Sequence, residues 1–173
     1  MRKIFLLYVL FAFLSSCDKN DDKNCSGADC LPPATQTGAD TFGCLVNGEP
    51  FVDKSRSFNC FYQFFDGEYY FSISAKFNKS IKGIGLGSQK IELLQAGSYQ
   101  LREIGAGNFS ADVFVDADNN FETSLIDTGT ISITKFDMEK KIVSATFEFT
   151  VTDPASGKVY KITEGRFDTH FTE

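Results

Sequence analysis

The stretches FSISAKF (residues 71–77) and SATFEFTV (residues 144–151) indicate the fold class, because both alternate between apolar and polar side chains. In the first, Phe71, Ile73 and Ala75 fall on one face, with serines and a lysine on the other. A period of two residues is typical of strands with one buried face and one solvated face. We therefore expect both stretches to be strands of an antiparallel β-structure.

Turn signals separate further apolar runs in the same region of the chain. Asn47-Gly48 and Asp66-Gly67 each lie between two such runs, and both pairs can adopt the positive φ angles of a two-residue hairpin. Roughly ten strands at regular spacing predict an antiparallel β-sandwich in a mostly meander order. A closed, lipocalin-like β-barrel is the alternative.

Two stretches depart from simple alternation. Residues 57–65, SFNCFYQFF, are apolar on both faces, which predicts a central strand, or a strand with one face that meets a partner or ligand. Residues 83–87, GIGLG, place glycines at alternate positions and do not fit the dinucleotide-binding pattern. Glycines spaced in this way within a strand allow a neighbouring chain or a bulky side chain to approach closely.

The N-terminal residues have the pattern of a secretory leader. Arg2 and Lys3 precede an uncharged apolar run over residues 4–14, which is too short for a bilayer core that needs about 20 residues. The order Leu14-Ser15-Ser16-Cys17 then matches a bacterial lipoprotein signal, in which small residues fit the peptidase. We predict a signal peptide over residues 1–16, cleavage between Ser16 and Cys17, and membrane attachment through lipid on Cys17.

Composition divides the remaining chain in two. Residues 17–40 contain almost no large apolar side chains, which predicts a flexible acidic tether. Residues 41–173 are rich in Phe, Tyr, Ile and Val, which predicts one all-β domain of ordinary size.

Four cysteines remain beside Cys17, namely Cys25, Cys30, Cys44 and Cys60. An exported protein meets an oxidising compartment, where an even set of cysteines can pair. We expect the pairs Cys25–Cys30 and Cys44–Cys60, with free buried thiols as the alternative. The spacing does not fit a zinc site.

No arrangement of residues predicts catalysis. The single histidine, His170, lies near the C-terminus, and no nucleophile motif accompanies it. Carboxylates are numerous but none is distinctively placed, and the chain lacks Trp, which often stacks on sugars. We therefore expect a protein that is not an enzyme and that holds no cofactor.

The stretch DADNNFETSLID (residues 116–127) resembles a calcium loop. Asp116, Asp118, Asn120 and Asp127 fall at positions 1, 3, 5 and 12 of that pattern. Phe121 stands where the loop needs glycine, and no helices are expected on either side. A polar hairpin loop is the favoured interpretation, and a calcium site is the alternative.

The chain is acidic, with a formal net charge of −6 that becomes more negative when Arg2 and Lys3 leave with the signal peptide. An acidic protein repels phosphate backbones, so we expect no nucleic-acid partner. A basic membrane-binding face is also disfavoured, so attachment to the membrane is expected to depend on the lipid.

Several long stretches carry a family resemblance: LPPATQTGADTFGCLVNGEPF (residues 31–51), GTISITKFD (129–137), IVSATFEFTV (142–151) and GKVYKITEGRFDTHF (157–171). They resemble a group of Bacteroidota lipoproteins of unknown function. The resemblance implies an all-β lipoprotein and supplies no activity and no catalytic residue. In that group, a lysine followed by acidic residues just after the lipidated cysteine resembles a surface-export signal, which Lys19, Asp21 and Asp22 match with Asn20 intervening.

We therefore expect an outer-membrane lipoprotein with a non-catalytic binding or accessory role. Display on the cell surface is the main expectation, and a periplasm-facing orientation is the alternative. Two other functions stay open: a barrel that holds a small ligand, and a glycan-binding or glycan-handling protein. The partner, a protein or a glycan, is not specified by the sequence.

Overall fold

A computed structural model of the chain describes residues 25–55, 58–76 and 81–173. The described chain is all-β, with one short 3-10 turn, η1 (Gly27–Cys30), before the first strand. The strands are β1 (Thr41–Val46), β2 (Glu49–Val52), β3 (Asn59–Phe65), β4 (Glu68–Lys76), β5 (Gly83–Gln89), β6 (Gly97–Leu101), β7 (Phe109–Asp116), β8 (Asn119–Glu122), β9 (Gly129–Asp137), β10 (Ile142–Thr152) and β11 (Val159–His170). The all-β prediction is confirmed.

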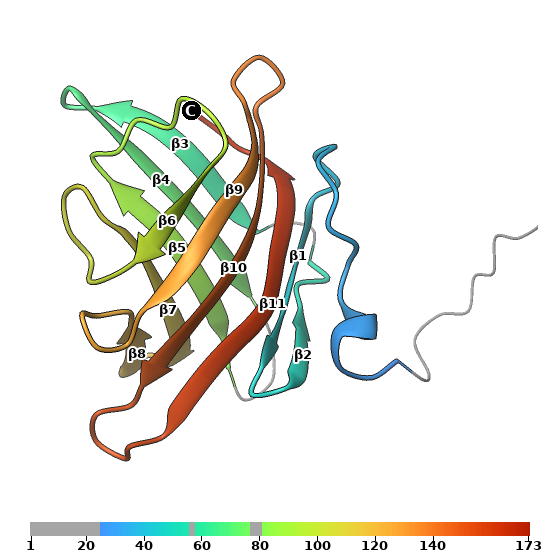
Figure 1. Cartoon of the computed structure of the whole chain (residues 1–173), viewed down its shortest axis with the longest axis vertical. Helices are drawn as coiled ribbons and strands as arrows, with labels where there is room; N and C mark the ends of the chain where they lie inside the picture. Colours follow the sequence, from blue (N-terminus) through green and yellow to red (C-terminus); the bar gives the residue numbers. More distant parts are fainter. Residues whose placement is uncertain (1–24, 56–57, 77–80) are drawn as a thin grey trace, which may run out of the picture.

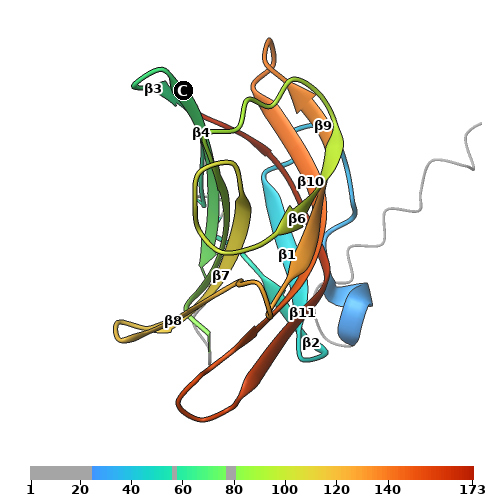
Figure 2. The ribbon, with the colours of Figure 1, turned by 60° about the vertical axis from the view of Figure 1, so that its left-hand side comes forward.

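All eleven strands belong to one sheet, which curls strongly into an open half-barrel (Figures 1 and 2). The order is β2-β1-β11-β10-β9-β6-β7-β5-β4-β3, and β8 pairs with β7 beside this path. The sheet is mixed, because β6 pairs with β7 in parallel whereas the other pairs are antiparallel. Many strands pair with the next strand along the chain. Three pairs join strands that are not consecutive in the chain, namely β1–β11, β6–β9 and β5–β7.

The sandwich prediction is therefore wrong, and the sheet is not closed into a barrel either. A sandwich needs two facing sheets, whereas here one sheet bends until its own inner face surrounds the core. Strand β10 shows register shifts with both neighbours, between Phe147 and Phe149 against β11 and between Ser144 and Ala145 against β9. Such bulges bend strands and increase their twist, and they let the sheet curl without a second layer.

Both predicted two-residue hairpins are confirmed. Asn47 (φ 51°) and Gly48 (φ 88°) join β1 to β2, and Asp66 (φ 50°) and Gly67 (φ 80°) join β3 to β4. Positive φ at both central residues suits the twist of the flanking strands.

The inner face of the curl holds an aromatic core. Phe42 on β1 is fully buried, and its ring centroid lies 5.4 Å from that of Phe147 and 6.2 Å from those of Phe51 and Phe167. Buried residues from β3, β4, β5, β7, β9 and β10 join the same cluster. In a lipocalin-like protein the interior holds the ligand, whereas here a continuous cluster of packed side chains occupies it.

Two contacts hold the curled sheet across its open side. Beyond β11, the backbone N–H of Thr172 donates to the carbonyl of Cys60 (3.0 Å), and the N–H of Tyr62 donates to the carbonyl of Thr172 (2.8 Å). After β2, the buried Asp53 carboxylate accepts a hydrogen bond from the N–H of Lys76 at the end of β4 (2.8 Å). Segments from both ends of the chain therefore fasten β3 and β4 to the rest.

Residues 31–40, which we name the strap, are attached to the domain. Leu31 is buried, and the ring of Pro32 lies so close to Gly43 on β1 that a Cβ there would meet it at 2.6 Å. The flexible tether predicted over residues 17–40 therefore does not extend through this segment.

One buried carboxylate, Asp168 on β11, holds the strap in place. It accepts hydrogen bonds from the backbone N–H groups of Thr37 (2.9 Å), Gly38 (2.9 Å) and Ala39 (3.1 Å). The hydroxyl of Thr35 donates at 2.6 Å, and that of a β10 serine donates from the other side at 2.8 Å. This concentration of donors around one anion makes Asp168 the main link between strap and sheet.

Candidate binding groove

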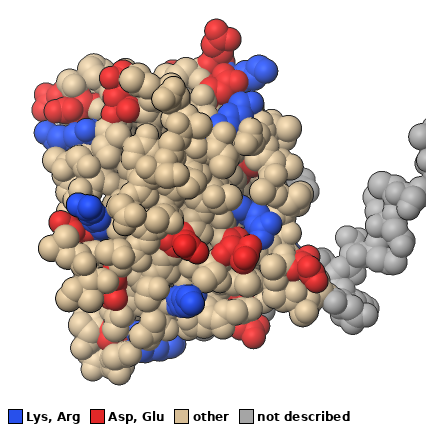
Figure 3. Space-filling view, in the orientation of Figure 1, with Lys and Arg blue, Asp and Glu red and all other residues tan. Residues whose placement is uncertain are grey.

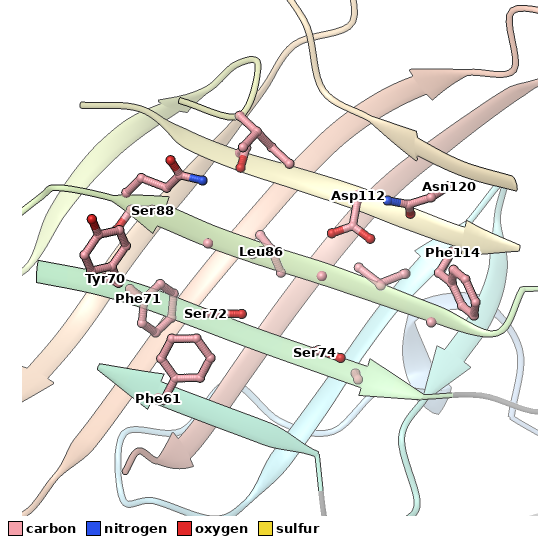
Figure 4. A pocket seen from close by; sticks show the side chains of 18 of the residues that line it. Phe61, Tyr70, Phe71, Ser72, Ser74, Leu86, Ser88, Asp112, Phe114 and Asn120 are labelled. Carbon is pink, nitrogen blue, oxygen red and sulfur yellow. The ribbon is translucent and has the colours of Figure 1, made fainter. Parts of the chain in front are cut away.

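Strand β5 has no side chains on its outer face over five residues. Gly83, Gly85 and Gly87 alternate with Ile84 and Leu86, which are buried in the core. Strands β4 and β7 flank β5 and project side chains on the same outer face. The bare strand thus becomes the floor of a groove of about 800 Å³ (Figure 4).

Small polar side chains form the walls of this groove. Gly87 lies in register between Ser72 on β4 and Ser110 on β7. Gly85 lies in register between Ser74 on β4 and an aspartate on β7. The hydroxyls of the three serines make no hydrogen bond with any residue that the structure describes.

Asp112 is the most unusual residue of the groove. Its carboxylate lies over Gly85, where an added Cβ would collide with it (Figure 4). Burial, and to a smaller extent the charge of Glu122 on β8, raise the pKa of Asp112 to about 6. No described residue donates a hydrogen bond to it. Asp112 is therefore a mostly ionised acceptor at neutral pH that faces the groove without a donor.

Aromatic rings stand at both ends of the groove. Phe61 on β3 and Tyr70 on β4 line one end, and Phe114 on β7 lines the other (Figure 4). Lys76 and Lys82 lie at the Phe114 end. The central-strand prediction for residues 57–65 is wrong, because β3 ends the sheet and its outer face has no covering strand in the described chain.

The sequence-predicted anchor lies outside the described residues. This applies to the signal peptide, the cleavage position between Ser16 and Cys17, and the surface-export residues Lys19, Asp21 and Asp22. The structure describes nothing of them, so they remain predictions.

The residues of the calcium-loop pattern are not brought together. Asp116 accepts hydrogen bonds from the N–H of Asp118 (3.0 Å) and the side chain of Asn119 (2.7 Å) within the β7–β8 turn. Asp127 instead accepts from the hydroxyl of Thr152 (3.1 Å), and Asn120 belongs to the groove lining. Across residues 25–55, 58–76 and 81–173, no group of three or more His, Cys, Asp or Glu side chains could hold a metal ion.

The cysteines behave in two ways. Cys25 and Cys30 form a disulfide around η1. Cys44 on β1 and Cys60 on β3 are free and buried, so the predicted bridge between them is not formed. Their strands are not neighbours in the sheet, which removes the basis for that prediction, and burial raises the pKa of both thiols well above the usual value.

We expect Cys44 and Cys60 to be unreactive in the folded protein, because only an accessible thiolate attacks a thiol reagent. A colorimetric thiol assay on the Cys17→Ala chain measures this. It should detect no reaction under native conditions and reaction of both thiols after unfolding. Rapid native reaction would contradict the described burial.

Two further observations concern the surface charge and membrane-spanning helices. On the face drawn in Figure 3, basic and acidic side chains are interspersed rather than gathered into patches of one sign. Among the residues that the structure describes, no helix has the length and apolar character to span a membrane.

Comparison with known proteins gives one match. A family model described as a domain of unknown function (DUF6252) matches residues 65–169, more than half of the chain. The matched region contains β4, β5 and β7, and hence the floor and both walls of the groove. Searches of curated proteins and of solved structures found no match.

Proposed function

The chain belongs to the DUF6252 family, whose description gives no activity, and from its groove and leader we propose that it is a lipid-anchored, outer-membrane binding protein without catalytic function. The observation that carries the binding role is the groove over β4, β5 and β7. Its volume lies within the range of small-molecule sites. It also presents polar groups that have no protein partner, as a ligand site requires.

The lining of the groove favours binding over catalysis. Hydrolysis of a glycosidic bond generally needs two carboxylates facing one cleft. Asp112 is the only carboxylate among the described lining residues. Its cross-strand partner Glu122 lies beside the groove and not in it. A single acceptor can orient a ligand but does not supply the acid and base pair.

The anchor is proposed from the leader and the arrangement of the strap. The order of charged, apolar and small residues before Cys17 supports lipid attachment at that thiol. Because the strap binds Asp168, the domain begins close behind the anchor. Lys19, Asp21 and Asp22 support display on the outer surface.

We expect Cys17→Ala to release the protein from bacterial membranes, because lipid chains contribute about 0.8 kcal/mol per buried CH₂ and the variant has none. Fractionation of cells that express each form, with immunodetection, measures the membrane-bound share. The wild-type chain should stay with the outer membrane and be digested by protease added to intact cells.

The matched control replaces Cys25 and Cys30 together by serine, which removes two cysteines and leaves Cys17. That double variant should remain in the membrane fraction. Retention of Cys17→Ala in the membrane would contradict the anchor. Protection of the wild-type chain from external protease would contradict surface display.

A further inference from the structure

We propose that the groove over β4, β5 and β7 binds a neutral oligosaccharide, whose hydroxyls donate to Asp112 and whose ring faces stack on the aromatic side chains at the groove ends. This inference names the ligand class of the binding role proposed above and rests on it.

The floor disfavours an extended peptide as the ligand. The backbone of β5 is paired with β4 along one edge and with β7 along the other, from Gly83 to Ser88. Its N–H and carbonyl groups are therefore engaged in the sheet and cannot pair with an added strand, which is how sheets usually bind extended peptides. A sugar ring needs no backbone pairing, and its C–H face can lie on the bare glycine surface.

The walls exclude a hydrocarbon chain. The hydroxyls of Ser72, Ser74 and Ser110 and the carboxylate of Asp112 lack partners in the described chain. Covering such groups with an acyl chain would remove water from them without replacing its hydrogen bonds, which is unfavourable. A polyhydroxylated ligand supplies donors to the carboxylate and both donors and acceptors to the serines.

The ends suit stacking, and the length suits several rings. Tyr70 and Phe61 stand at one end and Phe114, which is 38% exposed, at the other. The floor from Gly83 to Gln89 spans roughly 20 Å, since a strand rises about 3.3 Å per residue. Aromatic faces separated in this way can contact an oligosaccharide at two places, whereas a single sugar reaches only one.

The charge selects a neutral ligand. Asp112 lies over the middle of the floor with Glu122 beside it, and a phosphate, sulfate or carboxylate placed there would meet two like charges. Lys76 and Lys82 lie only at the Phe114 end. A cationic ligand would satisfy Asp112 but would be repelled by these two lysines at the Phe114 end.

Titration calorimetry of the Cys17→Ala chain tests this inference. The probes are neutral tetrasaccharides from a β-glucan, an α-glucan, a xylan and a mannan, with tetragalacturonate and spermidine as charged probes. At least one neutral tetrasaccharide should bind. Its affinity should fall at least about tenfold in Asp112→Ala, because a hydrogen bond to a charged group is lost.

Two further variants separate the site from general effects. Tyr70→Ala should also weaken binding several-fold, because a stacking ring is removed. Asp66→Asn removes one negative charge, as Asp112→Ala does, but in the exposed β3–β4 turn, and it should leave the affinity unchanged. Circular dichroism of each variant checks that the fold is kept.

The outcomes are distinct. Binding of no neutral probe, binding only of tetragalacturonate or spermidine, or an affinity that Asp112→Ala and Tyr70→Ala leave unchanged would overturn the oligosaccharide inference. None of these results affects membrane attachment, which Cys17→Ala tests separately, so failure of the ligand class and failure of the anchor can be told apart.

Discussion

Asp168→Ala should lower the free energy of unfolding by on the order of 3 kcal/mol, because it removes the acceptor of several hydrogen bonds at once. The N–H groups of Thr37, Gly38 and Ala39 would lose their partner, and the strap would leave the sheet. Urea unfolding of wild type and variant measures the difference. Limited proteolysis should cut the strap of the variant first.

The matched control for this prediction is Thr35→Val, which removes one donor to Asp168 and keeps the carboxylate. It should cost only about 1 kcal/mol, the usual contribution of one hydrogen bond. If Asp168→Ala lowered the free energy of unfolding by less than Thr35→Val does, the role assigned to the carboxylate would be contradicted.

The effect of Asp168 should also depend on pH. Burial alone would raise its pKa, but hydrogen bonds from Thr35, Thr37, Ser144 and Gly38 lower it more, so that it lies well below its ordinary value of 3.8. A carboxyl group with a lowered folded-state pKa stabilises the protein fully above the unfolded-state value and loses that contribution as the pH falls towards the folded-state value. The stability difference between wild type and Asp168→Ala should therefore be constant near neutral pH and shrink below about pH 4.

Phe42→Ala should cost about 3–5 kcal/mol, the range for truncation of a buried Phe. Phe42 has no exposed surface and its ring lies against Phe51, Phe147 and Phe167. These rings come from strands on both sides of β1, so a cavity there would weaken the packing that holds the curl. Urea or thermal unfolding measures the loss.

Phe65→Ala is the control, because its side chain is 71% exposed at the β3–β4 hairpin. A surface substitution of this kind should change stability by no more than about 0.5 kcal/mol. Equal losses in Phe42→Ala and Phe65→Ala would contradict an aromatic core on the inner face.

The sequence predicted local features of the fold well. The alternation of residues 71–76 and the Asn47-Gly48 and Asp66-Gly67 turns depend on neighbouring residues alone, and the structure confirms them. The arrangement of the sheet depends on pairs that are distant in sequence, such as β1 with β11 and β5 with β7. Strand alternation is the same in a sandwich and in a curled sheet, so it could not distinguish them.

The same reason limits what could be predicted of the groove. The glycines of residues 83–87 signalled a close approach, and at Gly85 the approaching group is the Asp112 carboxylate. The sequence could not identify it, because β7 reaches β5 only after the chain has passed through β6. Asp168 was missed in the same way, since its donors in the strap lie some 130 residues earlier in the chain.

The buried cysteines show how a reasonable local argument fails. Cys44 and Cys60 lie in strands that are close in sequence, which favoured a bridge. In the sheet, β1 pairs with β2 and β11, whereas β3 pairs with β4, and the two thiols remain separate. Cys25 and Cys30 are linked because their pairing needs only the short η1 turn.

The most direct test of the binding role is a map of amide chemical shifts while the Cys17→Ala chain is titrated with the neutral tetrasaccharides. The largest shifts should fall on Gly83, Gly85 and Gly87 and on the wall residues Ser72 and Ser110, all on the outer face of β4, β5 and β7. Shifts confined to the exposed apolar end around residues 64–65 and 138, or no shifts at all, would contradict the account.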